Sequence, residues 1–286
     1  KFSFAGLDDA ITATIGNATG CNSYTWTGNT SSAWNNSGNW TTSGTAGGFP
    51  DGNNEVSIPD VGTNPYPTLV ADAGTGDLTM ASAASINLNG FELALNGTLN
   101  VTGASIDASK PGSNLFISSA GAASLPANFI SNDVANFTVE NGTGATINST
   151  MNITEVLDVR QGTLTTNANI TMKCFFDNEP TTGDIRRTAQ IDEVGGVISG
   201  DVTVEQCFPG RRAFRYVSAS TTGSSIHDNW QEGATAYDNN PNPGYGIHIT
   251  GLGSVSGSGH SPTNPSPSDQ TQGLDWQPSG NPSMYS

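Results

Sequence analysis

The chain has 286 residues, enough for one large or two modest domains, and only 34% of them are hydrophobic, against an average of about 45–50%. Charged residues make up 12%, which argues against the charge-rich composition of disordered proteins. The net charge is −16, and so acidic a balance argues against nucleic acid as a partner, because nucleic-acid binding needs a basic footprint. No apolar run reaches the roughly 18 residues that a membrane-spanning helix needs, so we expect no such helix in this sequence.

Residues 1–22 are small and weakly patterned, and we interpret them as a linker or as the end of a preceding module. The chain opens on Lys1 without a signal peptide and stops at Ser286 without a terminal motif. We therefore expect an internal fragment of a longer polypeptide, with its targeting signals outside it.

Residues 23–70 are rich in aromatic side chains, among them Trp26, Trp34 and Trp40. The first turn of a solenoid has an open apolar end and an unpaired edge, so this segment is predicted to be an N-terminal cap. The alternative is a sugar-stacking platform built from the same three indoles. Buried indoles would favour the cap, and an exposed coplanar row would favour sugar binding.

Residues 71–172 repeat a short phrase of alternating apolar and polar residues, each closed by Gly or Asn. Examples are Ser85-Ile-Asn-Leu-Asn-Gly, Thr98-Leu-Asn-Val-Thr-Gly and Thr146-Ile-Asn-Ser. Alternation places every second side chain on one face of a strand, and Gly and Asn allow the chain to turn. The repeats predict an all-β protein, a β-solenoid of the parallel β-helix type.

Residues 173–286 are expected to form a C-terminal β/loop region. Further strands are predicted around residues 195–204, at 211–218 and at 247–250, within sequence that is increasingly rich in turns. This region holds two of the three cysteines, Cys174 and Cys207. A disulfide between them would close a loop of about 30 residues, and the alternative is two buried free thiols.

Calcium is the metal ion that the turns favour, because it binds clustered oxygen donors. The candidate ligands are Asp51, Glu55, Asp177, Glu179 and Asp238. None of these clusters matches an EF-hand, and ordinary turn chemistry is the alternative for each. The Asn-x-Ser/Thr sequons, Asn39 and Asn141 among them, are interpreted as turn and strand-surface residues.

No catalytic residue is assigned, and we do not expect an enzyme. A polysaccharide-cleaving β-helix would need two carboxylates beside a groove, or a carboxylate with Arg or Lys. Asp107, Glu155, Asp158 and Arg160 are the candidates. Glu155 and Asp158 are predicted on opposite faces of a strand, and a simple ion pair accounts for Asp158 with Arg160.

The segment from Tyr24-Thr-Trp-Thr-Gly to Trp40, the body repeats, and Asn242-Pro-Gly-Tyr-Gly-Ile-His-Ile-Thr-Gly resemble large secreted and cell-surface proteins of the Bacteroidota. This resemblance covers the chain from about residue 24 to its end. It implies a β-helical body, export by the type IX secretion route, and adhesin-like or gliding-associated roles. Cys174 and Cys207 depart from the pattern.

The expected function is therefore a structural or adhesive segment of a large exported protein, secreted or held at the outer face of the outer membrane. Secretion or translocon proteins of the outer membrane and a surface polysaccharide are the expected partners. The alternative function is a carbohydrate-binding or carbohydrate-processing β-helix module that uses the three tryptophans.

Overall fold

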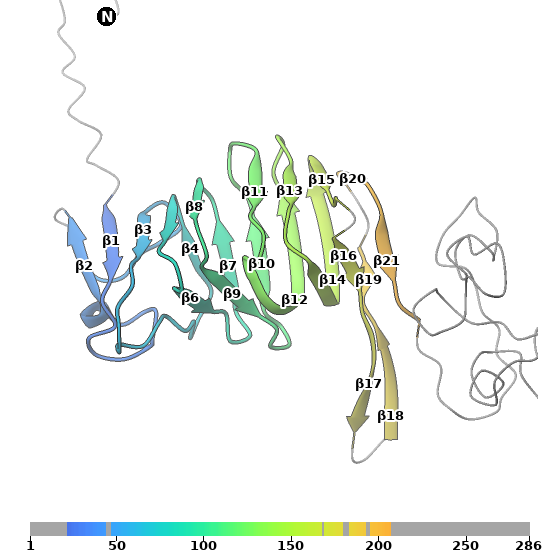
Figure 1. Cartoon of the computed structure of the whole chain (residues 1–286), viewed down its shortest axis with the longest axis horizontal. Coiled ribbons are helices and arrows are strands. Elements are labelled where there is room, and N and C mark those ends of the chain that lie inside the picture. Colours follow the sequence, from blue (N-terminus) through green and yellow to red (C-terminus); the bar gives the residue numbers. More distant parts are fainter. Residues whose placement is uncertain (1–21, 44–46, 168, 180–182, 193–194, 207–286) are drawn as a thin grey trace, which may run out of the picture. The chain divides into compact units, whose positions relative to one another are not determined.

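The computed structural model describes residues 22–206, apart from 44–46, 168, 180–182 and 193–194. These residues form an all-β solenoid of about five turns of parallel stacked strands, which confirms the predicted fold (Figure 1). Within them the one helical element is a 3-10 turn, η1 (Ser37–Asn39). The chain divides into two compact units, Lys1–Phe208 and Pro209–Ser286, and the second lies outside the described residues.

Each turn of the solenoid contributes strands to three faces, which the chain visits in the order face 1, face 2, face 3. Face 1 consists of β1 (Ser23–Trp26), β3 (Glu55–Ile58), β5 (Leu78–Met80), β8 (Leu99–Val101), β11 (Ala123–Leu125), β13 (Ala145–Ile147), β15 (Thr163–Thr165) and β20 (Val197–Ser199). Face 2 consists of β6 (Ser85–Asn87), β9 (Ser105–Ala108), the first parts of β12 (Ile130–Glu140) and β14 (Met151–Gln161), β16 (Ile170–Met172) and β21 (Val202–Val204). Face 3 consists of β4 (Ala73–Thr75), β7 (Glu92–Leu95), β10 (Asn114–Ile117), the second parts of β12 and β14, and β19 (Gln190–Ile191).

The core is a set of apolar columns that run along the stack. On face 3, Leu93, Leu115, Phe137 and Leu157 occupy the same register position in successive strands, and each is fully buried. Alternation along each strand points these side chains inward and their neighbours outward. Burying one such side chain stabilises the fold by about 1.5–3 kcal/mol, so the columns hold the turns together.

Small residues close the corners between faces. Between β6 on face 2 and β7 on face 3 the chain bends at Asn89, with φ of 53°, and Gly90, with φ of 92°. Few residue types adopt this left-handed conformation without strain, which explains why Asn and Gly end the repeated phrases. The length of a turn varies along the stack. Asn114 hydrogen-bonds to Glu92, 22 residues earlier and one turn away, whereas Asn152 hydrogen-bonds to Asp133, 19 residues earlier.

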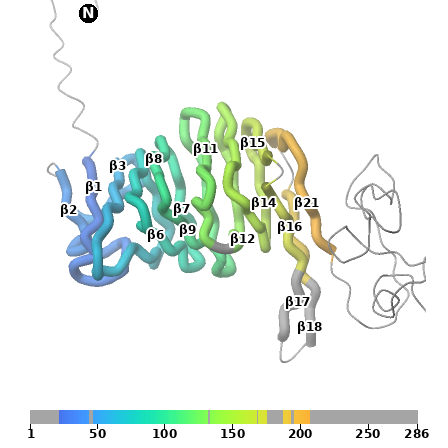
Figure 2. Tube along the Cα trace, in the orientation of Figure 1, coloured from blue at the N-terminus to red at the C-terminus, as the bar shows by residue number. Residues whose placement is uncertain are grey.

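A hairpin interrupts the last turn between face 2 and face 3 (Figure 1), and Figure 2 shows the stacked turns that precede it. It consists of β17 (Cys174–Glu179) and β18 (Gly183–Thr188), which pair in antiparallel fashion. After it the chain rejoins the stack, where β19 pairs with β14, β20 with β15 and β21 with β16. The stacked turns therefore reach Val204, beyond the boundary at residue 172 that the sequence predicted.

Candidate functional site

The tryptophan cluster lies at the N-terminal end of the solenoid, where β2 (Trp40–Ser43) pairs antiparallel with β1. Trp40 meets Trp26 and Trp34 edge to face, with ring centroids 4.8 and 4.9 Å apart. Tyr24 adds a further edge contact to Trp40 at 6.2 Å. The Trp26 Nε1 donates a hydrogen bond to the backbone oxygen of Pro65 at 2.9 Å, which ties the cluster to the loop that follows β3.

These indoles are part of the core and offer no platform for a sugar. Trp26 is 0%, Trp34 2% and Trp40 7% exposed, and their rings stand steeply to one another rather than in one plane. A sugar needs an exposed ring face, so the packing supports the cap and argues against stacking at these positions. The cap covers the first apolar layer with the bulkiest side chains of the described chain.

Asn39 and Asn141 are structural residues, and for them the interpretation as surface residues was wrong. Both are buried, at 0% and 1% exposure. The Asn39 Oδ1 accepts hydrogen bonds from the N–H groups of Thr30 and Ser31, both at 2.9 Å, and its Nδ2 donates to the backbone oxygen of Ala33 at 2.8 Å. A buried amide with its polar atoms paired fixes the loop beneath the cap.

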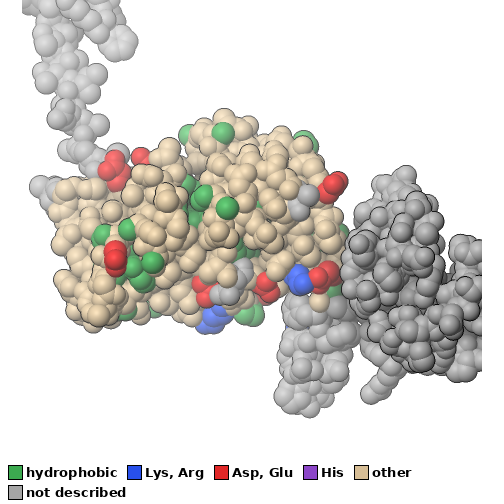
Figure 3. Space-filling model, viewed as in Figure 1, with side chains coloured by type: hydrophobic (Ala, Val, Ile, Leu, Met, Phe, Trp, Pro, Cys, Tyr) green, Lys and Arg blue, Asp and Glu red, His purple; other side chains and the backbone are tan. Residues whose placement is uncertain are grey.

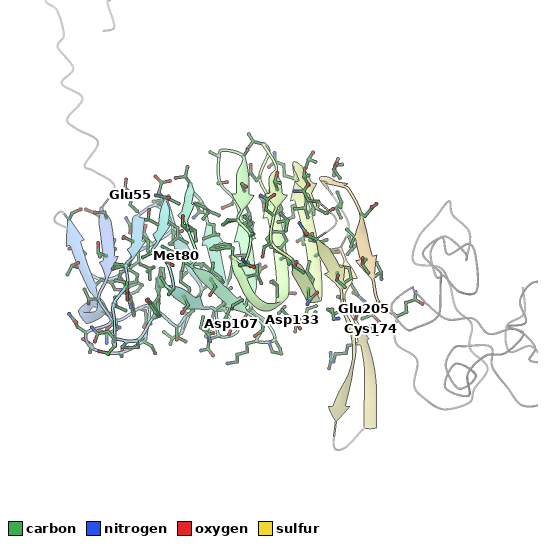
Figure 4. The ribbon with its side chains drawn as sticks, in the orientation of Figure 1. Glu55, Met80, Asp107, Asp133, Cys174 and Glu205 are labelled. Atoms are coloured by element: carbon green, nitrogen blue, oxygen red, sulfur yellow. The ribbon has the colours of Figure 1, made fainter. Side chains whose placement is uncertain are left out.

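The two described calcium candidates, Asp51 and Glu55, lie in the turn before β3 and at the start of that strand. The Asp51 Oδ1 accepts from the N–H of Asn53 at 3.1 Å, and the Asn54 Oδ1 accepts from the N–H of Asp51 at 2.8 Å. Glu55 follows at the exposed start of β3 (Figure 4). Among the described residues no group of three or more His, Cys, Asp or Glu side chains could hold a metal ion. The side chains of Asp177 and Glu179, and all of Asp238, lie outside the described residues.

The carboxylates considered for catalysis are each engaged in local structure. The Arg160 Nε contacts the Asp158 Oδ2 at 2.7 Å on the outer side of β14, and its Nη1 lies 3.5 Å from the Glu140 Oε2. The hydrogen bond to Asp158 raises the pKa of the Arg160 guanidinium. Exposed ion pairs of this kind contribute little, roughly 0–1 kcal/mol each.

The other two carboxylates hold backbone segments. The Glu155 Oε2 accepts from the Asn136 Nδ2 at 2.8 Å and from the N–H of Gly112 at 3.2 Å. The Asp107 Oδ1 accepts from the N–H of Ser109 at 3.1 Å. Asp107 and Glu155 therefore hold the turn that follows β9, a structural role.

Cys174 opens the hairpin and is disulfide-bonded. Its partner lies outside the described residues, as do Cys21 and Cys207. The register pairs Met172 with Val204, which stand two and three positions before Cys174 and Cys207 in the chain. Glu205 fastens the same corner, because its Oε1 lies 2.5 Å from the Lys173 Nζ and its Oε2 accepts from the N–H of Cys174 at 3.2 Å (Figure 4). The pairing of Cys174 with Cys207 stays a prediction, which this register supports.

The outer side of face 1 carries a regular feature that the sequence reasoning missed. One uncharged polar side chain per strand occupies the same outward position, in two runs of residues in register. We call these residues the face 1 ladder: Thr41, Thr25, Ser57, Thr79 and Asn100, then Ser124, Thr146, Thr165 and Ser199. Adjacent strands lie about 4.8 Å apart, so the ladder repeats at that spacing.

The face 1 ladder is accessible, since each member is partly or fully exposed. Figure 3 shows one side of the molecule, where neutral atoms dominate and charged side chains are scattered. The signal for the ladder was in the sequence, as the polar residue at the centre of Leu78-Thr-Met, Leu99-Asn-Val and Ala145-Thr-Ile. Without the register, nothing indicated that these centres align.

No protein-family model, no curated protein and no solved structure matches this chain. A search of the described residues for a helix both long and apolar enough to cross a membrane finds none. The fold and the geometry of the face 1 ladder are therefore the structural observations on which a functional proposal can rest.

Proposed function

We propose that the chain is a structural and adhesive segment of a large exported bacterial cell-surface protein, carried by the type IX secretion route. The motifs that resemble Bacteroidota surface proteins support the export route, and the solenoid agrees with the β-helical body that this resemblance implies. Turns that contact only their neighbours build an extended and regular surface, which suits display and contact. Surface adhesion and gliding are the processes that such a segment serves.

The observation that carries the adhesive role is the face 1 ladder. Its nine members are hydroxyl and amide groups at one position of successive strands. A single exposed hydroxyl binds weakly, but a row on one rigid support can engage a repeating ligand at many points together. An uncharged row also avoids the desolvation cost of charged groups.

A neutral surface polysaccharide is the ligand class that this chemistry favours. Sugar hydroxyls exchange hydrogen bonds with Ser, Thr and Asn side chains, each of which both donates and accepts. The sequence offered carbohydrate binding by the three tryptophans as the alternative function. Because these tryptophans are buried, we assign carbohydrate binding to the face 1 ladder instead.

Adhesion is tested with two charge-matched double variants. Thr79→Glu with Thr146→Glu adds two carboxylates to the face 1 ladder, one in each of its runs. Ser85→Glu with Thr171→Glu adds the same charge to outward positions of face 2. Binding to a glycan array and to polysaccharide-coated beads should fall at least about tenfold for the first variant only, because charge desolvation opposes a neutral ligand. Equal losses for both variants, or no binding by the unmodified chain, would contradict the role of the ladder.

Export is tested separately by mass spectrometry of the intact complex purified from the native cells. Co-purification with outer-membrane translocon subunits, together with cleavage of the chain by protease added to whole cells, is the expected result. A chain that stays protected inside the cell would contradict the export route and leave the ladder experiment unaffected.

A further inference from the structure

Face 1 is interrupted between β8 and β11, which follow one another along the stack (Figure 1). A five-stranded sheet ends at β8 and a four-stranded sheet begins at β11, and within the described chain these two strands do not pair. The other two faces continue across the same level, because β7 pairs with β10 and β9 pairs with β12. We call this interruption the face 1 break. It coincides with the gap between the two runs of the face 1 ladder.

The corner between faces 3 and 1 changes length at the face 1 break. Leu95 at the end of β7 is followed four positions later by Leu99, the first residue of β8. Ile117, which pairs with Leu95, is followed only six positions later by Ala123, the first residue of β11. The corner that leads to β13 keeps the longer form, and β13 pairs with β11. We attribute the break to this step in corner length.

The break leaves apolar side chains of the core less well covered. Leu99 and Val101 hold inward positions of β8, in register with Leu78 and Met80 of the preceding turn. Leu78 and Met80 are 0% and 2% exposed, whereas Leu99 and Val101 are only partly buried. The interruption in strand pairing is therefore accompanied by greater solvent access to the core.

Backbone groups of β8 point into the break. The N–H of Leu78 donates to the oxygen of Thr98, so Thr98 and Asn100 direct their backbone groups to β5. Successive residues of a strand direct these groups to opposite sides. Leu99 and Val101 therefore direct their N–H and C=O groups toward β11, with which β8 does not pair.

Ser124 points into the break from the other side. The N–H of Ala123 donates to the oxygen of Gly144, so Ala123 faces β13 and Ser124 faces β8. Counting back equally from Ile106 and its partner Ile130 in the next turn places Asn100 opposite Ser124. A closed parallel sheet would carry two hydrogen bonds here, which would join Ser124 to the residues of β8 on either side of its opposite number.

The spacing at the break suits one oxygen atom between the strands. Cα atoms of β8 and β11 come within 8 Å of each other. Paired strands lie about 4.8 Å apart, and an oxygen that accepts from one strand and donates to the other adds about 2.8 Å. A whole strand inserted between them would need about 9.6 Å. The spacing therefore favours a hydroxyl group over an inserted strand.

We infer that the face 1 break is the subsite that fixes one sugar residue of the neutral polysaccharide, an inference that rests on the adhesive function proposed above. A hydroxyl both donates and accepts, so a sugar hydroxyl can accept from the N–H of Val101 and donate to the C=O of Ser124. The side chains of Asn100 and Ser124 flank this position as the adjoining members of the face 1 ladder. The break sets the register of the polymer, and the two runs of the ladder add contacts on either side.

Hydrogen exchange measured on the full chain by NMR tests the inference, with neutral glucan, mannan and galactan hexasaccharides as probes. In the free chain the amides of Val101 and Ser124 should exchange at least about tenfold faster than those of Asn100 and Ala123, which face paired strands. A bound hexasaccharide should slow the amides of Val101 and Ser124 at least about tenfold. The amides of Asn100 and Ala123 should keep their rates.

Two variants of Val101 separate the backbone donor from the side chain. Val101→Pro removes the N–H that faces the break, at a strand-edge position where Pro is tolerated. Val101→Ala also shortens the side chain but keeps the N–H, and is the matched control. Val101→Pro should bind the hexasaccharide about three- to tenfold more weakly than Val101→Ala, which is the loss of one hydrogen bond. Thermal unfolding of both variants shows whether they are equally folded.

Three results would overturn the inference. Slow exchange of Val101 and Ser124 in the free chain would mean that the break is closed. Equal binding by the two Val101 variants, without protection of these amides by the sugar, would remove the subsite and leave the adhesive role of the ladder intact. Absence of binding by the unmodified chain would contradict the adhesive function itself, and the subsite with it.

Discussion

The Trp40 Nε1 donates a hydrogen bond of 2.7 Å to the backbone oxygen of Trp34, and the two rings meet edge to face at 74°. The Nε1 of Trp34 itself is buried and has no hydrogen-bond partner among the described residues. Trp34 and Trp40 are thus similar in size and burial, but only the N–H of Trp40 donates a hydrogen bond.

This difference predicts unequal effects of two similar substitutions. Trp40→Phe removes a buried hydrogen bond and leaves the Trp34 oxygen without its donor, which should lower the free energy of unfolding by about 1–3 kcal/mol more than Trp34→Phe. Both variants lose similar ring area, so Trp34→Phe is the control. Urea unfolding followed by circular dichroism measures the two losses. An equal loss in both variants would show that the Trp40 hydrogen bond contributes nothing.

Asn141 predicts a second pair of variants. Its Nδ2 donates to the Ser119 Oγ at 3.0 Å and to the Gly121 oxygen at 2.8 Å, and its Oδ1 accepts from the N–H of Thr143 at 3.0 Å. Asn141→Ala should cost about 2 kcal/mol or more, because it removes the hydrogen bonds by which a buried side chain joins two turns. Asn148→Ala, at an exposed sequon of the next corner, should cost less than about 0.5 kcal/mol. Denaturant midpoints measure both losses, and a loss for Asn141→Ala no larger than that for Asn148→Ala would show that the burial of Asn141 has no energetic role.

Gly97 and Gly121 predict a steric contrast at one corner of successive turns, between faces 3 and 1. A Cβ at Gly97 would lie 2.4 Å from the backbone carbon of Gly76, whereas a Cβ at Gly121 would meet nothing within 4 Å. Gly97→Ala should therefore destabilise the fold by about 1–3 kcal/mol through overpacking against backbone. Gly121→Ala should be neutral or stabilising by up to about 1 kcal/mol. Thermal unfolding of the two variants gives the comparison, and tolerance of Gly97→Ala would mean that the turns separate easily.

Asp77 predicts a pH dependence. Its Oδ1 accepts from both the N–H and the hydroxyl of Thr98 at 2.7 Å, and these bonds, the backbone one first, hold the pKa of Asp77 below its usual 3.8. A lowered folded-state pKa gives stabilisation that is present above 3.8 and is lost as the pH falls through the folded value. Because this carboxylate is exposed, the contribution should be below about 1 kcal/mol.

The comparison of Asp77→Asn with the unmodified chain measures this contribution. The difference in unfolding free energy should be largest near neutral pH and should shrink well below pH 3.8. A difference that stays constant across this range would assign the stabilisation to packing at the corner rather than to the ionised carboxylate.

The sequence alone was sufficient for the fold class, because period-two alternation and the turn residues are local properties of the chain. Segments such as Ser85-Ile-Asn-Leu-Asn-Gly specify a strand and a corner regardless of what they contact. The end of the stack was not predictable in this way. The sequence prediction ended the repeats at residue 172, and only the pairing of β20 with β15 shows that the turns resume after the hairpin of β17 and β18.

Burial and alignment were decided by the tertiary structure. The sequence left the three tryptophans open to two interpretations, and the edge-to-face packing of Trp40 on Trp34 resolves them in favour of the cap. Asn141 and Asn148 have similar local sequences, yet one is buried between turns and the other faces solvent. The face 1 ladder exists only because the register brings Thr79 beside Asn100 and Thr146 beside Thr165. Local pattern fixes which side of a strand a residue occupies, whereas its neighbours along the stack depend on the length of every intervening corner.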